Sequence, residues 1–166
     1  IAAFATSNPR VTDAVTEMVA CRVVDNAAVA LAAINRQPVA SARAMALCHP
    51  REGGATLYGI PPETRVHAEW AAWANATAVR ELDYHDTFLA ADYAHPGDTL
   101  APIIAIAQQT GQNGKDLLRA AAVAYEVHVA LVKAISLHAH KKDHMAHLLP
   151  ASVAGIGALL NLPTDT

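Results

Sequence analysis

The sequence predicts an all-α fold, an array of about six antiparallel helices, and three observations lead to this prediction. Hydrophobic residues make up 53% of the 166 residues, yet aromatic residues make up only 5%. Alanine supplies much of that apolar total, which favours closely packed helices over a sheet, where β-branched and aromatic residues are enriched. Apolar residues also recur at three- and four-residue steps, and short turns separate the segments that carry them. The length suits a single domain with a buried core.

The first half of the chain is expected to form three helices. Residues 9–34 carry an apolar stripe at helical spacing. A second helix is expected over residues 38–47, because its opening proline suits the first positions of a helix. Residues 49–64 are rich in glycine and proline and predict a loop, with a short extended piece at 55–58. A third helix is expected over residues 66–82.

The second half is expected to form three more helices. A fourth helix is expected over residues 99–110. Its proline, Pro102, is tolerated because the N–H groups of the first helical turn have no hydrogen-bond partner within the helix. Residues 111–114, Gly-Gln-Asn-Gly, predict a tight turn, since glycine takes positive φ readily. The fifth helix, over residues 115–137, carries one broad apolar face. The sixth begins between residues 143 and 150 and runs to residue 160, and an early start would leave its proline to kink it.

Composition excludes several classes of function. A formal net charge of −3 with nine histidines leaves no basic footprint for nucleic acid. The sequence contains no apolar run of the length that a membrane span needs, and no signal peptide is visible. The two cysteines, Cys21 and Cys48, do not make a disulfide framework in a chain of this length. A reducing, cytoplasmic setting is therefore the default expectation.

Chemistry-bearing side chains gather between residues 81 and 99. Asp83 and Thr87 are four residues apart, so one helical turn would put both on the same face. The proline after His95 biases that histidine toward an extended conformation. Asp98 suits the N-cap of the next helix, whose free N–H groups could hold a carboxylate or phosphate beside His95. The stretch predicts an active-site corner, with a solvated polar loop as the alternative.

A second cluster, residues 138–147, is rich in histidine and lysine. His140 and His144 are four residues apart and His144 and His147 three, so on a helix either pair could bind a metal ion. Neither pair belongs to a strong zinc motif. The cluster also fits a cationic helix end, favoured by the helix dipole, or a site of proton transfer near neutral pH. These three interpretations stay open on spacing alone.

The sequence resembles the MmgE/PrpD family over nearly its whole length. The resemblance is closest over residues 70–98, which contain Ala-Val-Arg-Glu-Leu-Asp and His-Pro-Gly-Asp, and extends to residues 22–28, 114–118 and 142–147. Within the family it is closest to the actinobacterial 2-methylcitrate dehydratases. The resemblance implies a helical domain that carries a smaller α+β domain, assembled as a homodimer. It also implies removal of water from 2-methylcitrate in propionate breakdown, although a relative decarboxylates cis-aconitate.

The family's motif residues fall on four positions of this sequence. The resemblance assigns Asp83, His95 and His144 to catalysis and Thr87 to binding of a small tricarboxylate substrate. His140 and His147 lie close to His144, and their roles stay open. The chemistry fits, because dehydration needs a base for the α-proton, an acid for the departing hydroxyl and donors for substrate oxygens. A metal-free route without cofactor is expected, since the two cysteines are too few to ligate an iron–sulfur cluster.

The resemblance also implies that residues 1–166 are part of the helical domain alone. The family's smaller α+β domain is absent from this chain, and further active-site residues of the family are expected beyond Thr166. We therefore expect the isolated piece to be inactive. If the helices over 99–110 and 115–137 run antiparallel, His95 and His144 should line one cleft, with their rings within about 10 Å. The alternative is a non-catalytic or metal-binding helical module.

Overall fold

A computed structural model describes residues 1–165 and confirms the all-α fold. The α-helices are α1 (Ala2–Ala5), α2 (Asp13–Ala32), α3 (Gln37–Leu47), α4 (Ala68–Arg80), α5 (Leu100–Thr110), α6 (Gly114–Ala134) and α7 (Leu148–Leu159). Shorter elements are the strands β1 (Pro50–Ala55), β2 (Phe88–Leu89) and β3 (Tyr93–Ala94) and the 3-10 turns η1 (Pro96–Thr99), η2 (His138–His140) and η3 (His144–His147). Over residues 1–165 the largest sheet is the two-stranded β2–β3 hairpin.

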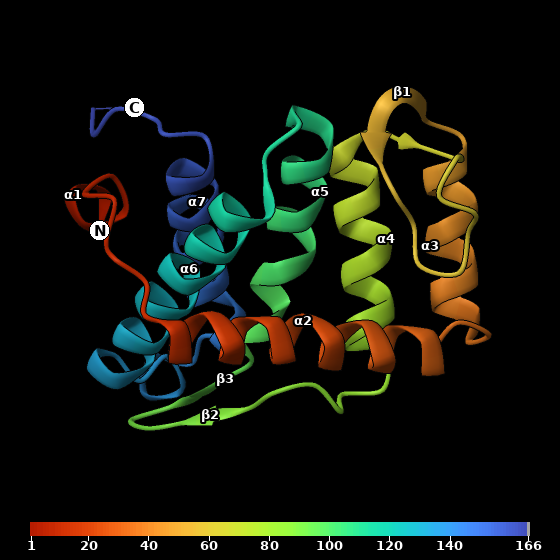
Figure 1. Cartoon of the computed structure of the whole chain (residues 1–166). Coiled ribbons are helices and arrows are strands. Elements are labelled where there is room, and N and C mark those ends of the chain that lie inside the picture. Colours follow the sequence, from red (N-terminus) through yellow and green to blue (C-terminus); the bar gives the residue numbers. More distant parts are fainter. Residues whose placement is uncertain (166) are drawn as a thin grey trace.

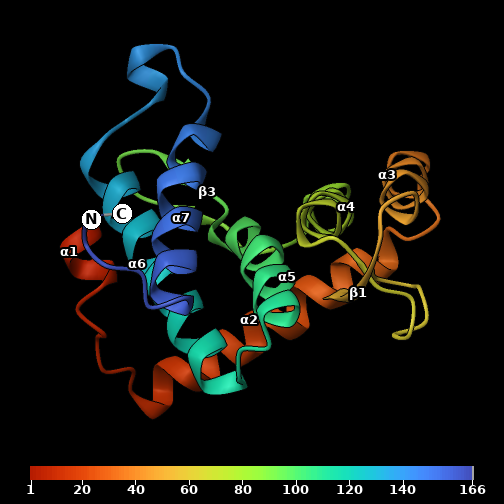
Figure 2. The same cartoon turned by 90° about the horizontal axis from the view of Figure 1, so that it is seen from above.

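The helices form an upright row that one long helix crosses. Helices α3, α4, α5 and α7 stand side by side, and α2 runs across their lower ends (Figure 1). Viewed from above, α3 and α4 are seen along their axes while α2 lies lengthwise beneath the row (Figure 2). Consecutive helices from α3 to α7 alternate in direction, whereas α2 crosses the row (Figure 1). Among the described residues, no helix is both long and apolar enough to cross a membrane.

The tight turn between α5 and α6 sends the chain back toward the start of α5. Gly111 ends α5 with a φ of 68°, the left-handed conformation for which glycine is suited. The side chain of Asn113 then caps α6 by accepting the N–H of Asp116 at 3.0 Å. This confirms the predicted turn and brings the connection between α6 and α7 to the lower end of the array, where α5 begins (Figure 1).

Several predicted boundaries were wrong by a few residues. The extended piece in the first loop is Pro50–Ala55, where the chain makes isolated bridges to Val66, and not residues 55–58. The helix predicted to reach residue 137 ends at Ala134. The last helix begins at Leu148, after a 3-10 turn, so its proline lies in the first turn and the predicted kink has no cause.

Helices α6 and α7 approach closely at Gly155, which gives a stability prediction. A Cβ on Gly155 would lie 2.7 Å from Ile103 Cδ1 and 2.9 Å from Ala124 Cβ. Gly155→Ala should therefore lower the free energy of unfolding by about 1–2 kcal/mol through overpacking. Gly157→Ala in the same helix meets nothing within 4 Å and should raise it by up to about 1 kcal/mol. Urea unfolding of both variants checks this, and equal effects would contradict the close approach.

Candidate active site

The two histidine-bearing segments meet at the lower end of the helical row. The segment between α4 and α5 carries His95, and the segment between α6 and α7 carries His144. Their ring centroids are 5.6 Å apart, with an interplanar angle of 64°. The prediction that these rings lie within about 10 Å is confirmed, and both side chains are buried.

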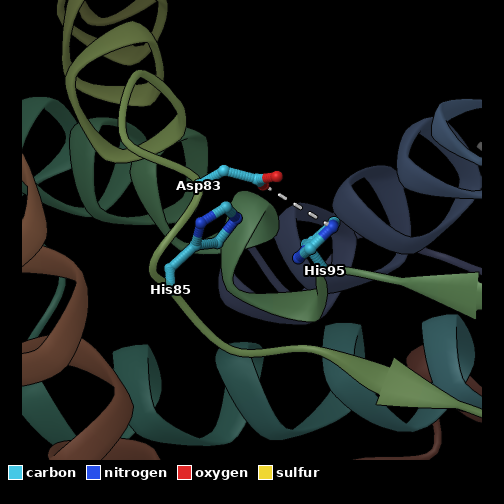
Figure 3. A group of neighbouring side chains, drawn as sticks. All are labelled: Asp83, His85 and His95. Carbon is cyan, nitrogen blue, oxygen red and sulfur yellow. Dashed lines mark ion pairs between the residues drawn. The ribbon is translucent and has the colours of Figure 1, made fainter.

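The ring of His95 is oriented by a hydrogen bond to the backbone. Its Nδ1 lies 2.9 Å from the carbonyl oxygen of Asp86, which can only accept, so Nδ1 carries a proton and donates it. The Thr87 hydroxyl lies 3.4 Å from the same nitrogen. Nε2 is left as the atom that gains or loses a proton, and it lies 3.8 Å from Asp83 Oδ1 (Figure 3). This fixed tautomer is what an acid–base group needs.

The sequence suggested that Asp83 and Thr87 share one face of a helix, but they do not. Helix α4 ends at Arg80, and Asp83 takes a left-handed conformation with a φ of 57°, which Asp tolerates better than most residues. Arg80 forms an ion pair with Asp83 at 3.1 Å and helps to hold it there. Asp83 and Thr87 instead approach His95 at different ring nitrogens. Both predicted residues are thus at the site, by a route that helical spacing does not describe.

Asp98 is not the N-cap of α5 that the sequence predicted, but has another structural role. Thr99 occupies the cap position of α5, and Asp98 lies within the turn η1. One oxygen of Asp98 accepts a hydrogen bond from His85 Nε2 at 2.8 Å, and the other lies 3.8 Å from Arg80 Nη1. Residues 96–100 are all buried, as His95 is. The binding of an anion at this helix end stays a prediction.

A buried network beneath the site holds the turn that follows His95. Asp86 accepts the N–H of Gly97 at 2.8 Å and the hydroxyl of Tyr125 at 2.9 Å. Asn26 of helix α2 donates to the carbonyl of Gly97 at 2.7 Å. Burial, followed by the charge of Asp86, raises the pKa of Tyr125, so that phenol stays protonated as a donor. Helix α2 is thereby hydrogen-bonded directly to the site, a contact that no local sequence signal reveals.

His144 has a different environment from His95. Neither of its ring nitrogens has a hydrogen-bond partner among residues 1–165. The Asp143 carboxylate lies 3.3 Å from Nδ1 but without hydrogen-bond geometry. Burial lowers the pKa of His144, the positive charge of Arg80 adds to this, and Asp143 opposes it. The ring is therefore neutral at neutral pH, with a free lone pair beside His95.

The other two histidines considered in the second cluster have no place beside His95. His140 is exposed in the turn η2, whereas His144 and His147 belong to the separate turn η3. His147 is buried and donates from Nε2 to the carbonyl of Ile135 at 3.2 Å, which is a structural contact. Since His140 and His144 do not share a helix, the first of the two metal-binding pairs that spacing allowed is not formed. In the second pair, His144 with His147, the Nε2 atom of His147 is already bonded to Ile135.

One group among residues 1–165 does have metal-ligand spacing. Asp83, His85 and His95 each offer a ligand atom, and these atoms lie within 4.8 Å of one another (Figure 3). However, Asp83 already has a cationic partner in Arg80, and His85 Nε2 is bonded to Asp98. Because a guanidinium already balances these carboxylates, we assign no metal here. Arg80 and His85 are site residues that the sequence reasoning missed.

The buried side chain of His128 should make the protein less stable in acid. Burial first, and then the charge of His147, lower the pKa of His128 to about 4, against 6.5 for the free side chain. Above pH 6.5 His128 is neutral in both states and the stability is intact. Between pH 6.5 and 4 only the unfolded chain takes up the proton, so the free energy of unfolding should fall by up to about 3 kcal/mol. Urea unfolding at several pH values should show this fall, and His128→Leu should reduce it. Equal pH dependence in both proteins would contradict it.

The fold and the site together define a class, an all-α domain with a candidate acid–base site of histidines and carboxylates at one end. The chain belongs to the MmgE/PrpD family, since the MmgE/PrpD N-terminal domain matches residues 1–166. It is 32% identical over 107 residues to the probable 2-methylcitrate dehydratase of Saccharomyces cerevisiae, covering 57% of this chain and 21% of that protein.

Bacterial relatives give a similar result. The chain is 30% identical over 105 residues to the 2-methylcitrate dehydratases of Cupriavidus necator and Escherichia coli, covering 57% of this chain and 22% of each relative. The chain thus spans about a fifth of the length of the curated relatives it matches.

Proposed function

We propose that this chain supplies part of the active site of a hydro-lyase that removes water from 2-methylcitrate by metal-free acid–base catalysis. The observation that carries the proposal is the 5.6 Å separation of the His95 and His144 rings, which have contrasting surroundings. Two imidazoles held in different environments at one site can serve opposite proton transfers. The names of the relatives support 2-methylcitrate as the substrate.

His144 is the proposed base. It is buried, neutral and free of hydrogen bonds to residues 1–165, so its lone pair is available to a bound substrate. It takes the proton from the carbon next to the carbinol carbon, and the electron pair of that C–H bond becomes the second bond of the new C=C. A base that burial keeps neutral is active at neutral pH without competing protonation.

His95 is the proposed acid. Its Nδ1 is committed to the Asp86 carbonyl, so Nε2, next to the Asp83 carboxylate, is the atom proposed to carry the proton that is transferred. As the C–O bond breaks, Nε2 donates this proton to the hydroxyl, which leaves as water. Thr87 is exposed beside the same ring and is proposed to donate to a substrate oxygen. The two protons that move are then accounted for by two named rings.

A product assay on the full-length enzyme tests this function. 2-Methylcitrate, citrate and cis-aconitate would each be supplied, with the unsaturated product followed by ultraviolet absorbance and carbon dioxide measured in parallel. We expect an unsaturated product from 2-methylcitrate, no carbon dioxide, and full activity after chelation. Carbon dioxide from cis-aconitate without dehydration would instead assign the decarboxylase chemistry of the same family.

The setting of the enzyme is part of the proposal. We place it in the cytoplasm, in propionate breakdown, as a homodimer assembled through the helical domain. The exposed apolar side chains of Leu149 and Val153 on α7, 71% and 59% accessible, support a further contact of this domain. The chain alone is proposed to be inactive. Turnover by residues 1–166 alone would contradict the view that other parts of the enzyme complete the site.

A further inference from the structure

The ring of Tyr93 contacts histidine rings of both segments that form the site. Its ring centroid is 4.6 Å from that of His144 and 5.0 Å from that of His138, with interplanar angles of 39° and 33°. It also approaches the edge of His95, at 6.3 Å and 78°. These distances fall in the range of favourable aromatic packing. Tyr93 is thus the aromatic ring that contacts both proposed catalytic histidines.

The ring of His144 is not held by hydrogen bonds to the described residues. A buried imidazole is usually oriented by hydrogen bonds, but neither nitrogen of His144 has one among the described residues. The turn η3 fixes its backbone, since the side chain of Asp143 accepts the N–H of Met145 at 2.8 Å. The aromatic rings that contact His144 are those of Tyr93 and His95.

Tyr93 is itself anchored through Asp92. Asp92 accepts the N–H of Tyr93 at 2.9 Å and two hydrogen bonds from His138, from Nδ1 at 2.7 Å and from the backbone N–H at 3.0 Å. The backbone N–H of His138 is the main cause that lowers the pKa of Asp92, so it remains a carboxylate. Asp92 therefore joins the β2–β3 hairpin to the turn η2 and keeps His138 against Tyr93.

We propose that Tyr93 is a positioning residue, which fixes the plane of the His144 ring toward His95 by packing against both His144 and His138. Its catalytic consequence rests on the function proposed above. The ring, and not the hydroxyl, carries this role, because the contacts are ring to ring. Removing the ring would let His144 rotate away from the substrate, and small displacements of a catalytic group are costly.

Kinetics of the full-length enzyme provide the first test. Tyr93→Leu should lower kcat by about tenfold or more with KM changed by less than about threefold, whereas Tyr93→Phe should retain kcat. Tyr84→Leu is the matched control, because Tyr84 lies on the same segment and is 79% exposed, and it should behave as wild type. Equal kcat in Tyr93→Leu and wild type, or loss in Tyr93→Phe as large as in Tyr93→Leu, would overturn the proposal.

A spectroscopic test separates positioning from the proposed function. In the same protein with labelled histidine, the His144 Cε1–H resonance should be shielded by the Tyr93 ring. The shielding should be lost in Tyr93→Leu, reduced in Asp92→Asn and kept in Tyr93→Phe and Tyr84→Leu. An unchanged resonance in both Tyr93→Leu and Asp92→Asn would overturn the proposal, even in an active enzyme. Loss of shielding in an enzyme without dehydratase activity would support the positioning and refute the function.

Discussion

Replacing His95 or His144 by alanine in the full-length enzyme should lower kcat by about 10²-fold or more. This is the usual scale for losing a general acid or base. The two rings are 5.6 Å apart and buried, and each retains a nitrogen that is free for proton transfer with a substrate. Steady-state kinetics with 2-methylcitrate, together with circular dichroism to confirm folding, measure the effect.

His140→Ala is the matched control for these two variants. His140 lies in the same histidine-rich segment but is exposed and separate from the site, so its kcat should match wild type. A loss in His140→Ala comparable to that in His144→Ala would show that the catalytic histidine of this segment has been misassigned. A wild-type kcat in His95→Ala would show that His95 is not the general acid.

Gly97→Ala should lower the free energy of unfolding by about 3 kcal/mol, because it combines overpacking with damage to buried hydrogen bonds. A Cβ on Gly97 would lie 2.5 Å from Asp86 Oδ1 and 2.8 Å from Asn26 Oδ1. These two side chains bond the N–H and carbonyl of Gly97, and the backbone of Asp86 orients His95. The variant should therefore also lower kcat.

Gly114→Ala provides the control for that substitution. A Cβ on Gly114 meets nothing within 4 Å, and its φ is not in the left-handed region, so stability should change by less than about 1 kcal/mol. Urea unfolding compares the two variants. Equal stability of Gly97→Ala and Gly114→Ala would show that the turn after His95 is not held as tightly as its contacts indicate.

Much of the fold was predictable because its signals are local. Helical spacing of apolar residues identified the long helices, and the Gly-Gln-Asn-Gly turn at 111–114 predicted the return of the chain that brings His144 to His95. The orientation of α2 was not predictable, since helical periodicity does not say which way a helix crosses its neighbours. That orientation depends on contacts such as Asn26 with Gly97, which are far apart in the sequence.

The candidate site was predictable in its residue types but not in its geometry. The resemblance pointed to Asp83, Thr87 and His95, and the structure places all three together. Helical spacing does not explain why Asp83 and Thr87 lie together, because α4 ends before Asp83 and Asp83 takes a left-handed conformation. Tyr93 was missed, since an aromatic residue on a short hairpin has no local signal for its partner. The two tyrosines crowded among the histidines of residues 81–99 were the available hint.

The most direct test of a shared acid–base site is the kcat/KM of the double variant. His95→Ala, His144→Ala and the combination would be measured with 2-methylcitrate in the full-length enzyme. Groups that act as a unit give strongly non-additive losses, so the double variant should lose less than about tenfold beyond the more damaging single variant. A double loss equal to the product of the two single losses, about 10⁴-fold or more, would contradict a site in which His95 and His144 act on one substrate together.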